Sequence, residues 1–367
     1  MTSILFYLFL SILFQFAGCG EISSQDNDFL SFQLFHIEED KNRSNFLFST
    51  EKRSRSRDTS VPGKGTGSDS DWQKKCFCSA NTQKKRWNSC QTEKVLAQGR
   101  IENIIPAQLT GRTIKFYLYI ALEDKHGFFP GNGSYLPGTM KAIFKVKHRG
   151  MDFTSPNAEI AAFKLARLLQ FNQVPPAAFR RLSESYLLQL LKKMDLKKAN
   201  KFKHDVYSGN NLITGAAVYY SDGFTNFEST RIYTDWLFKK KDTGLGVSRK
   251  KLAKQMGKVI LFDFLTGNYD RFSGGNIMKH KTGRLLFIDH GAGFGAGREW
   301  KKQKAWELLR KLKKVSEEFV ARISQLSNVK IKRCLKDTLS ENQICEIINR
   351  KKKLLEYLNN KYKGSYY

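Results

Sequence analysis

The chain has 367 residues, of which 41% are hydrophobic, and this is enough apolar material for one two-lobed domain or two small domains. With 28 Phe and 14 Tyr, the composition excludes a chain that is disordered throughout. The 63 Lys and Arg residues outnumber the 34 Asp and Glu residues, so the formal net charge is +29. Such a surface attracts acidic partners, whether nucleic acid, anionic membrane, acidic peptide or sulfated glycan, and charge alone does not choose among them.

The first residues predict entry into the secretory pathway. The run ILFYLFLSILFQFAGCG has the length of a signal peptide and ends on small residues near Ala17 and Gly18. We predict a signal peptide or an uncleaved amino-terminal anchor over residues 1–20, with a buried core segment as the remaining alternative. The expected location is the Golgi lumen or the extracellular space. Nucleic acid is therefore not an expected partner, and membrane contact is expected only through this segment if it is retained.

Residues 21–95 are predicted to form a disordered polar stem, because EKRSRSRDTSVPGKGTGSDSD is rich in Ser, Gly and charge. Sequons that begin at Asn42 and Asn132 agree with secretion and make both asparagines candidate glycosylation sites. Secretion also permits disulfides. Cys334 and Cys345 are near enough in sequence to pair. A second cluster consists of Cys76, Cys78 and Cys90. These cysteines could pair with one another or with Cys334 and Cys345, and the sequence does not decide between these pairings.

Residues 96–218 show the pattern of a small, β-rich lobe. Alternating apolar residues predict strands in RTIKFYLYIALE (112–123) and in TMKAIFKVKH (139–148). In the second strand, Lys145 lies on the face opposite Ala142, Phe144 and Val146, which directs it toward a cleft. A helix is expected from Ser155, its N-cap, to the residues before two consecutive prolines. LLQLLKKMDLKK predicts another helix, and NLITGAAVYYSDGF predicts a strand that ends in a turn.

Residues 219–367 show the pattern of a mostly helical lobe. A helix is predicted to begin at Ser248 and to end at Gly267. The segments NIMKH and RLLFID, joined by the turn KTG, predict a β-hairpin. Basic amphipathic helices are expected around residues 299–325 and 341–362. The overall prediction is an α+β chain.

Five polar residues occur along the chain in the order that phosphoryl transfer requires. Kinase-like enzymes use a strand Lys to hold nucleotide phosphates, a helix Glu to hold that Lys or a metal, and a loop Asp to accept the hydroxyl proton. Lys145 in AIFK, Glu159 in the next helix and Asp270 in GNYDRFSGGN match these parts. Asn276 and Asp289, the latter in LFIDHGAGFG, match the residues that hold divalent metals, although Asn276 lies one position farther along than in H-R-D-x-x-x-x-N.

Each of these residues alone has an ordinary structural alternative. Lys145 alone fits a solvated strand, and Glu159 fits a helix-dipole partner. Asp270 and Arg271 fit a local salt bridge, while Asn276 and Asp289 fit simple turns. The joint order and spacing of the set is what favours a phosphotransferase site over these alternatives.

The chain resembles a family of atypical secretory-pathway kinases that includes the Golgi casein kinase, the Golgi xylosylkinase and Four-jointed. The resemblance lies in AIFK, NAEIAAFKLARLLQFNQVPP, GAAVYY, LFDFLTGNYDR and LFIDHGAGFG, over roughly residues 110–295. It implies a two-lobed kinase-like fold, ATP as donor and Mn²⁺ or Mg²⁺ as metal. By position, it implies that Lys145 and Glu159 bind nucleotide, that Asp270 is the catalytic base and that Asp289, Asn276 and Glu159 are the metal ligands. It also implies an adenine-binding hinge formed by Ala216, Ala217, Val218 and Tyr219.

The chain departs from that family at the position five residues after Asp270, where the relatives carry Glu and this chain has Gly275. The expected function is ATP-dependent transfer of phosphate to a hydroxyl of secreted or Golgi cargo, with protein Ser/Thr as the first acceptor class. Alternatives are a glycan kinase of the xylose type, a nucleotide-binding pseudokinase that activates another kinase, or a non-catalytic glycan-binding protein. Expected partners are an acidic secreted protein or proteoglycan substrate and a homo- or heterodimer with a related kinase.

Overall fold

The structure is a computed structural model, and it describes residues 89–107, 113–122, 138–151, 154–221, 223–227, 231–239, 244–272, 275–295 and 299–361. All of them belong to the unit Asp69–Tyr367. The expected amino-terminal signal, both sequons, Cys76 and Cys78 lie outside the described residues. Among the helices of the described part, none is long and apolar enough to cross a membrane.

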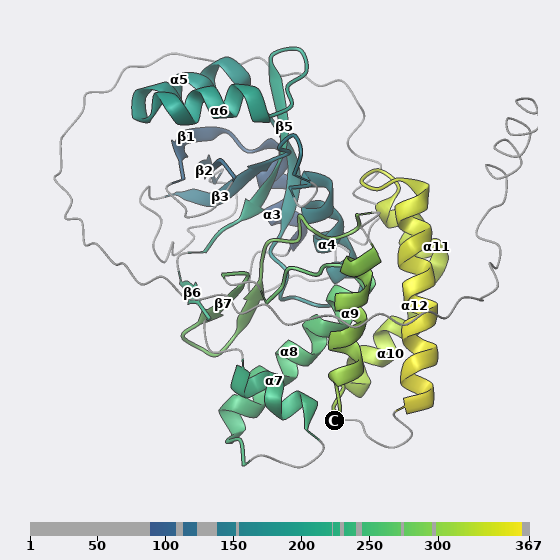
Figure 1. The fold of residues 1–367 in the computed structure, drawn as a ribbon. Coiled ribbons are helices and arrows are strands. Elements are labelled where there is room, and N and C mark those ends of the chain that lie inside the picture. The colour runs from purple at the N-terminus through teal and green to yellow at the C-terminus, as the bar shows by residue number, and fades with distance from the viewer. Residues whose placement is uncertain are drawn as a thin grey trace, which may run out of the picture. The chain divides into compact units, whose positions relative to one another are not determined.

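A five-stranded antiparallel sheet forms the β-rich lobe (Figure 1). Its order is β1-β2-β3-β5-β4. Alternate residues of β2 and β3, such as Phe116 and Phe144, are fully buried on one face. Lys145 lies on the other face, as its alternation predicts. The strands are β1 Ile101–Pro106, β2 Lys115–Ala121, β3 Thr139–Val146, β4 Ala177–Ser183 and β5 Leu212–Tyr219.

Helices cover the apolar face of this sheet. α5 (Glu184–Met194) and α6 (Leu196–Asp205) lie side by side above it in Figure 1 and share its hydrophobic cluster. α3 (Ser89–Gln98) packs against β4 and β5, and its Glu93 forms a buried ion pair, at 2.6 Å, with Arg167 of the helix Pro156–Leu168. α3 begins inside the segment expected to be a disordered stem. That expectation is wrong from Ser89 onward, because Ser89–Gln98 is helical and both Thr92 and Glu93 are buried.

α4 (Pro156–Leu168) joins the sheet to the helical lobe. Ser155 caps it through a 3.2 Å hydrogen bond that its hydroxyl accepts from the Ala158 N–H, as predicted. Its buried face belongs to the same hydrophobic cluster as the helical lobe. The helix that carries Glu159 is therefore fixed by packing against both halves of the fold.

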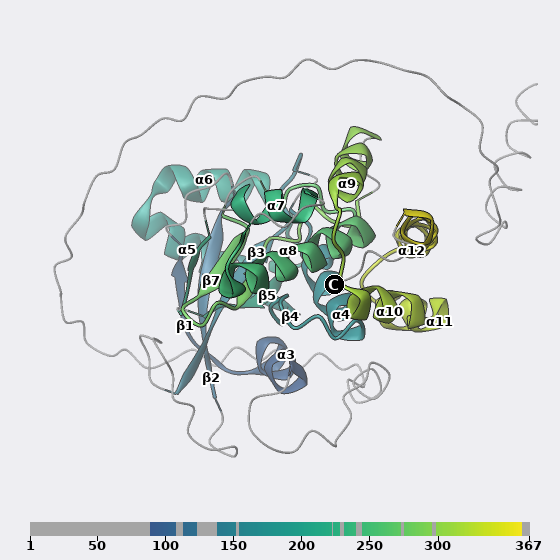
Figure 2. The ribbon, with the colours of Figure 1, turned by 90° about the horizontal axis from the view of Figure 1, so that it is seen from below.

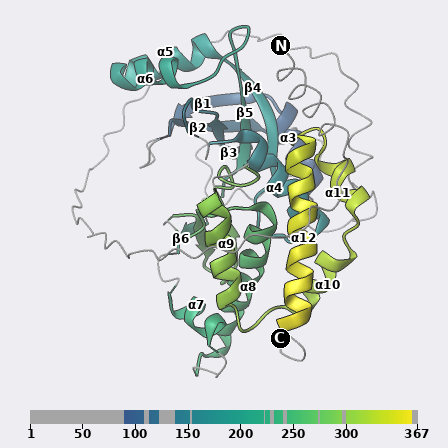
Figure 3. The same ribbon diagram turned by 45° about the vertical axis from the view of Figure 1, so that its right-hand side comes forward.

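The helical lobe is organised around one long helix, α8 (Val247–Thr266), which contacts α7, α9 and α12. Figure 3 shows α8, α9 and α12 below the sheet, and Figure 2 shows the same helices from beneath. Gly246, not Ser248, occupies the N-cap of α8, which makes no side-chain capping bond. The expected helix over 299–325 is divided, and a further helix, α11, follows it. The remaining bounds are α7 Arg231–Phe238, α9 Glu299–Lys311, α10 Glu317–Gln325, α11 Asn328–Leu335 and α12 Glu341–Lys361.

A three-stranded sheet combines one strand that precedes α7 with two strands that lie between α8 and α9 in the sequence. It consists of β6 (Phe224–Asn226), β7 (Ile277–His280) and β8 (Leu285–Phe287), and β7 with β8 is the expected hairpin. Gly267 ends α8 in the left-handed conformation (φ 68°), which suits glycine and reverses the chain into the loop that carries Asp270.

Two cysteines of the helical lobe do not behave as their proximity in sequence suggests. Cys334 is buried in α11 and is not the disulfide partner of Cys345, although Cys345 is disulfide-bonded. The two residues sit on different helices, α11 and α12. The buried thiol packs as a small apolar side chain in the helical lobe.

Replacement of Gly215 in β5 by Ala is expected to destabilise the fold. A Cβ atom added there would lie 2.5 Å from the carbonyl oxygen of Lys145 and 2.6 Å from the Phe144 ring. Overfilling a packed core typically costs about 1–3 kcal/mol, so the urea midpoint of Gly215→Ala should fall. Gly209→Ala is the matched control, because nothing lies within 4 Å of a Cβ atom at that position. Equal midpoints for the two variants would contradict the steric argument.

Candidate active site

Lys145 is held by two carboxylates from distant parts of the chain. Its Nζ lies 2.6 Å from Glu159 Oε1 and 3.1 Å from Asp289 Oδ1. Only 14% of the Lys145 side chain is exposed, and Glu159 is buried. Burial alone would lower the pKa of Lys145, but the negative charges of Asp289 and Glu159 outweigh it and raise that pKa above its usual value. The cation is therefore permanent and fixed in position.

Glu159 also ties the start of α4 to the segment that follows β8. Its Oε1 accepts a 3.1 Å hydrogen bond from the Gly291 N–H. In return, the Ser155 N–H donates to the Gly291 carbonyl at 3.3 Å. These two bonds hold Glu159, the partner of Lys145, close to Gly291, which lies two residues after Asp289. Glu159 is thus better suited to hold Lys145 than to bind a metal through the same oxygen.

Asp289 has a strained backbone at the position where a ligand is expected. Its φ is 60°, in the left-handed region that residues with a Cβ rarely adopt. Its side chain is 38% exposed, in contrast to the buried Glu159. The positive charge of Lys145 lowers the pKa of Asp289 well below its usual value, and burial opposes this only in part. Asp289 is therefore an ionised carboxylate that reaches the surface of the site.

Arg271, next to the predicted base, is one of the largest fully buried side chains of the described part. Its guanidinium forms a forked ion pair with Asp263, through Nε to Oδ2 at 3.0 Å and Nη2 to Oδ1 at 3.2 Å. It also donates to the carbonyls of Asn276, at 2.8 Å, and Ile288. The sequence also allowed a local salt bridge between Asp270 and Arg271. Arg271 instead pairs with Asp263 of α8. Burial raises the pKa of Asp263, and Arg271 opposes that rise.

His290 completes the buried network. Burial lowers its pKa well below the ordinary value, and the Arg271 charge adds to that effect, so the ring is neutral. Its Nδ1 accepts from Arg271 Nη2 at 3.1 Å, and its Nε2–H donates to the Phe287 carbonyl at 3.0 Å. This bonding pattern assigns the tautomer. Arg271 therefore fixes the loop of Asp270 and the loop of Asp289 to each other and to α8.

Asp270 occupies a loop whose backbone is bonded on both sides. Its N–H donates to Asn268 Oδ1 at 3.2 Å, and its carbonyl accepts from Asn276 Nδ2 at 2.7 Å. The Asp270 carboxylate stands in a half-buried position. Asn276 is buried, and its amide nitrogen stabilises the Asp270 loop across the extra residue noted in the sequence. The described contacts do not join the Asn276 side chain to Asp289, so its role as a metal ligand stays a prediction.

A second lysine, Lys115, lies beside Lys145. Lys115 on β2 is directly opposite Lys145 on β3, so both side chains project from the same face. Burial lowers the pKa of Lys115, and the nearby Lys145 charge lowers it further. Like charges directly opposite each other are destabilising unless an anion lies between them. The alternation of β2 contained this signal, but no motif draws attention to Lys115.

The expected hinge needs correction. Ala216, Ala217 and Val218 lie inside β5, where β3 pairs with one edge and β4 with the other. The Tyr219 N–H donates to the Pro176 carbonyl, and the Tyr220 N–H donates to the Lys141 carbonyl. The sheet ladders therefore occupy the backbone of these residues. The segment that leaves the sheet begins at Tyr220. Ala216 instead lies directly opposite Lys145 and forms part of the floor of the site.

The residues present fit a divalent metal only in part. Asp289 supplies an exposed carboxylate and Asn276 an amide oxygen, which are the hard ligands that Mg²⁺ and Mn²⁺ prefer. Within the described ranges, no cluster of three or more His, Cys, Asp or Glu residues could hold a metal by itself. A metal here would need nucleotide phosphates or water to complete its coordination, which is usual for Mg²⁺.

Comparison with solved structures identifies the fold. The structure described as hydra Fam20 with sugar matches with a TM-score of 0.52 and 17% identity, over 74% of this chain and 90% of that chain. The Golgi casein kinase with Mn/ADP bound matches with a TM-score of 0.53 and 14% identity, over 75% and 76%. A further structure of the Golgi casein kinase matches with a TM-score of 0.54, 14% identity, and coverage of 74% and 76%. No protein-family model and no curated protein sequence matches. The predicted kinase-like α+β fold is confirmed.

Loss of Arg271 is expected to unfold the loops around the site. Arg271→Ala leaves the buried Asp263 carboxylate without its partner, which typically costs about 3–5 kcal/mol. Lys258→Ala is the control, because its ion pair with Glu318, at 3.7 Å, is more exposed and should contribute no more than about 1 kcal/mol. Urea unfolding measures both free energies. A loss for Arg271→Ala as small as that of the control would contradict a stabilising role for the buried pair.

Proposed function

We propose that this chain is an ATP-dependent kinase of the secretory pathway that transfers the γ-phosphate to a hydroxyl of secreted or Golgi cargo. The observation that carries the proposal is the bridge from Lys145 to both Glu159 and Asp289, beside a braced loop that presents Asp270. The kinase fold supports it, although a fold alone does not fix function. The apolar amino-terminal run supports the secretory location.

Each residue has a role that follows from its position. Lys145, and beside it Lys115, neutralise the phosphates of the nucleotide, because both cations project from one face of the sheet. Asp270 accepts the proton of the acceptor hydroxyl, and the backbone hydrogen bonds of its loop hold it in place. Asp289, ionised and partly exposed, holds a divalent metal. The bound metal would supply positive charge that offsets the charge of the phosphates.

The donor and metal proposed are ATP and Mn²⁺ or Mg²⁺. A fold neighbour, the Golgi casein kinase, was solved with Mn/ADP bound, and this supports the choice. The acceptor is proposed to be protein Ser/Thr, with a glycan hydroxyl as the second candidate, because another neighbour was solved with sugar. The net charge of +29 suits an acidic acceptor of either kind.

The function is tested with purified protein, labelled ATP and Mn²⁺, offered acidic peptides in one arm and glycan primers in the other. Label transfer to either acceptor supports the kinase proposal and identifies the acceptor class. A rise in melting temperature with ATP and Mn²⁺, but no transfer to any acceptor or to the chain itself, would favour the nucleotide-binding pseudokinase. Neither a shift nor transfer, together with retention on heparin, would favour a non-catalytic glycan-binding protein.

Substitution of the two acids of the site is expected to affect phosphate transfer and nucleotide binding differently. Asp270→Ala should lower transfer by about 10²–10⁴-fold, because it removes the base, and should keep the thermal shift that ATP and Mn²⁺ produce. Asp289→Ala should lose both transfer and the metal-dependent shift. Asp337→Ala, on an exposed position, is the control that keeps both. Unchanged transfer by Asp270→Ala would exclude this residue as the base.

The two lysines of the site should differ in their effect on stability. Lys145→Gln leaves the buried Glu159 without its cation, so the melting temperature without nucleotide should fall. Lys115→Gln removes a charge that its surroundings disfavour, so that temperature should stay constant or rise. Both variants should bind ATP several-fold more weakly, on the order of 1 kcal/mol per lost charged contact. A fall in melting temperature for Lys115→Gln as large as for Lys145→Gln would contradict the assignment.

A further inference from the structure

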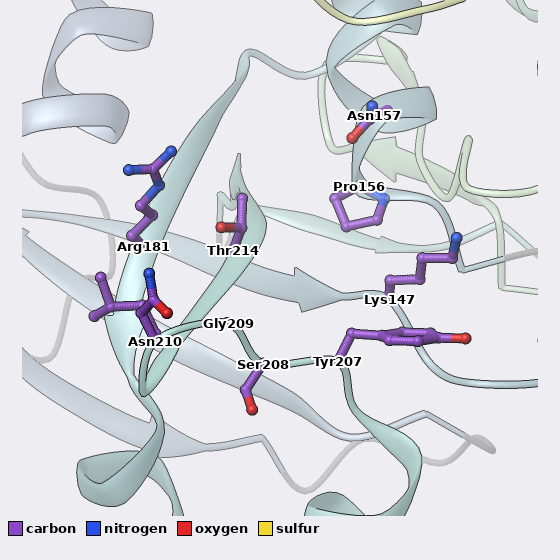
Figure 4. Close-up of a pocket in the computed structure, with 10 residues that line it drawn as sticks. Lys147, Pro156, Asn157, Arg181, Tyr207, Ser208, Gly209, Asn210 and Thr214 are labelled. Atoms are coloured by element: carbon purple, nitrogen blue, oxygen red, sulfur yellow. The ribbon is translucent and has the colours of Figure 1, made fainter. Parts of the chain in front are cut away.

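An open pocket of about 510 Å³ lies where the end of β3 meets the start of α4. It begins at Lys147, two residues after Lys145, and extends to Arg181 on β4 and to the loop from Tyr207 to Leu212 (Figure 4). Pro156 and Asn157, the first two residues of α4, form its rim. The residues of the proposed phosphoryl-transfer site do not line it. The pocket is therefore a concave site separate from those residues, with a volume in the range of small-molecule sites.

Positive charge faces this pocket from two sides. Figure 4 shows Lys147 with Tyr207 on one side and Arg181 with Asn210 on the other. The Lys147 ammonium lies 5.5 Å, and the Arg149 guanidinium 5.0 Å, from the centre of the Tyr207 ring. Of the described residues that line the pocket, none is acidic. Cations that converge on a concave surface without a carboxylate concentrate anions there.

The remaining lining favours a sugar as the carrier of the negative charge. Tyr207 is 51% exposed and offers an aromatic surface, while uncharged hydrogen-bonding groups surround it. The uncharged groups are Asn157, Ser208, Asn210 and Thr214.

We propose that this pocket binds an acidic saccharide of one or two rings that carries sulfate or phosphate esters. Arg181 and Lys147 bind ester groups at opposite ends, because an arginine fork suits a tetrahedral anion and a lysine acts as a point charge. Tyr207 contacts the sugar with the part of its ring that the Lys147 and Arg149 cations leave open. The side chain of Asn157 is fixed by a 2.9 Å hydrogen bond that it donates to the Thr338 carbonyl of the helical lobe. The ligand would therefore contact the start of α4, the helix that carries Glu159.

The test measures binding to the full chain by calorimetry with a sulfated disaccharide, the same disaccharide without sulfate, inorganic sulfate and a phosphoserine peptide. We expect the sulfated disaccharide to bind, and the variant Lys147→Ala/Arg181→Ala to weaken its binding about tenfold or more. Tyr207→Leu, which keeps every charge, should weaken it as well. The control Lys332→Ala/Arg333→Ala removes the same charge from an exposed surface of α11 and should keep the affinity. Hydrogen exchange should show protection over residues 207–212.

Several results would overturn the proposal. Equal weakening in the α11 control would assign binding to the general positive charge of the chain. Equal affinity for inorganic sulfate would exclude sugar recognition, and tighter binding of the phosphopeptide at the same residues would assign the pocket to a peptide. Each variant is checked by its melting temperature, and Tyr207→Leu tests the site without any change in charge. None of these outcomes depends on catalysis, so they are separate from the test of phosphoryl transfer.

Discussion

The arrangement of the site depends on the ion pairs that the Lys145 ammonium forms with two carboxylates. Its two carboxylate partners are Glu159, 14 residues away, and Asp289, 144 residues away. One cation therefore joins the sheet, α4 and the segment after β8. Because Glu159 is buried, its charge is tolerated only while this cation and the Gly291 N–H remain bonded to it. The lobes are thus coupled through an electrostatic contact rather than through packing alone.

The second constraint lies on the other side of the site, in the buried pair of Arg271 and Asp263. Arginine is suited to this position because its planar group reaches a carboxylate, two carbonyls and a histidine nitrogen at once. Lysine could not satisfy the same set. The consequence is that the loop of Asp270 and the loop of Asp289 share one anchor on α8, so their separation is fixed by a side chain that never meets solvent.

Much of this organisation was predictable where the information is local. The alternation of β3 assigned Lys145 to the cleft face, and Ser155 assigned the start of α4. The role of Arg271 was not predictable, because its acidic neighbour in sequence is Asp270, whereas its partner is Asp263, brought close by the turn at Gly267. Strand β4 was also not predicted, because the contacts of its polar residues come from segments distant in the sequence. Its central arginine pair is polar in sequence, and only in the folded chain does Arg180 donate to the carbonyls of Leu96 in α3 and of Gly99 just after it.

The pair of Lys115 and Lys145 shows why stability and binding are opposed in this site. A fold selected for stability alone would not place two lysines directly opposite each other on a half-buried face. The carboxylates of Glu159 and Asp289 neutralise Lys145, whereas burial, and after it the charge of Lys145, lower the pKa of Lys115. A polyanion placed over this face removes the repulsion and gains attraction from both cations. The arrangement that weakens the empty site would therefore strengthen an occupied one, which is the behaviour that the proposed phosphate site requires.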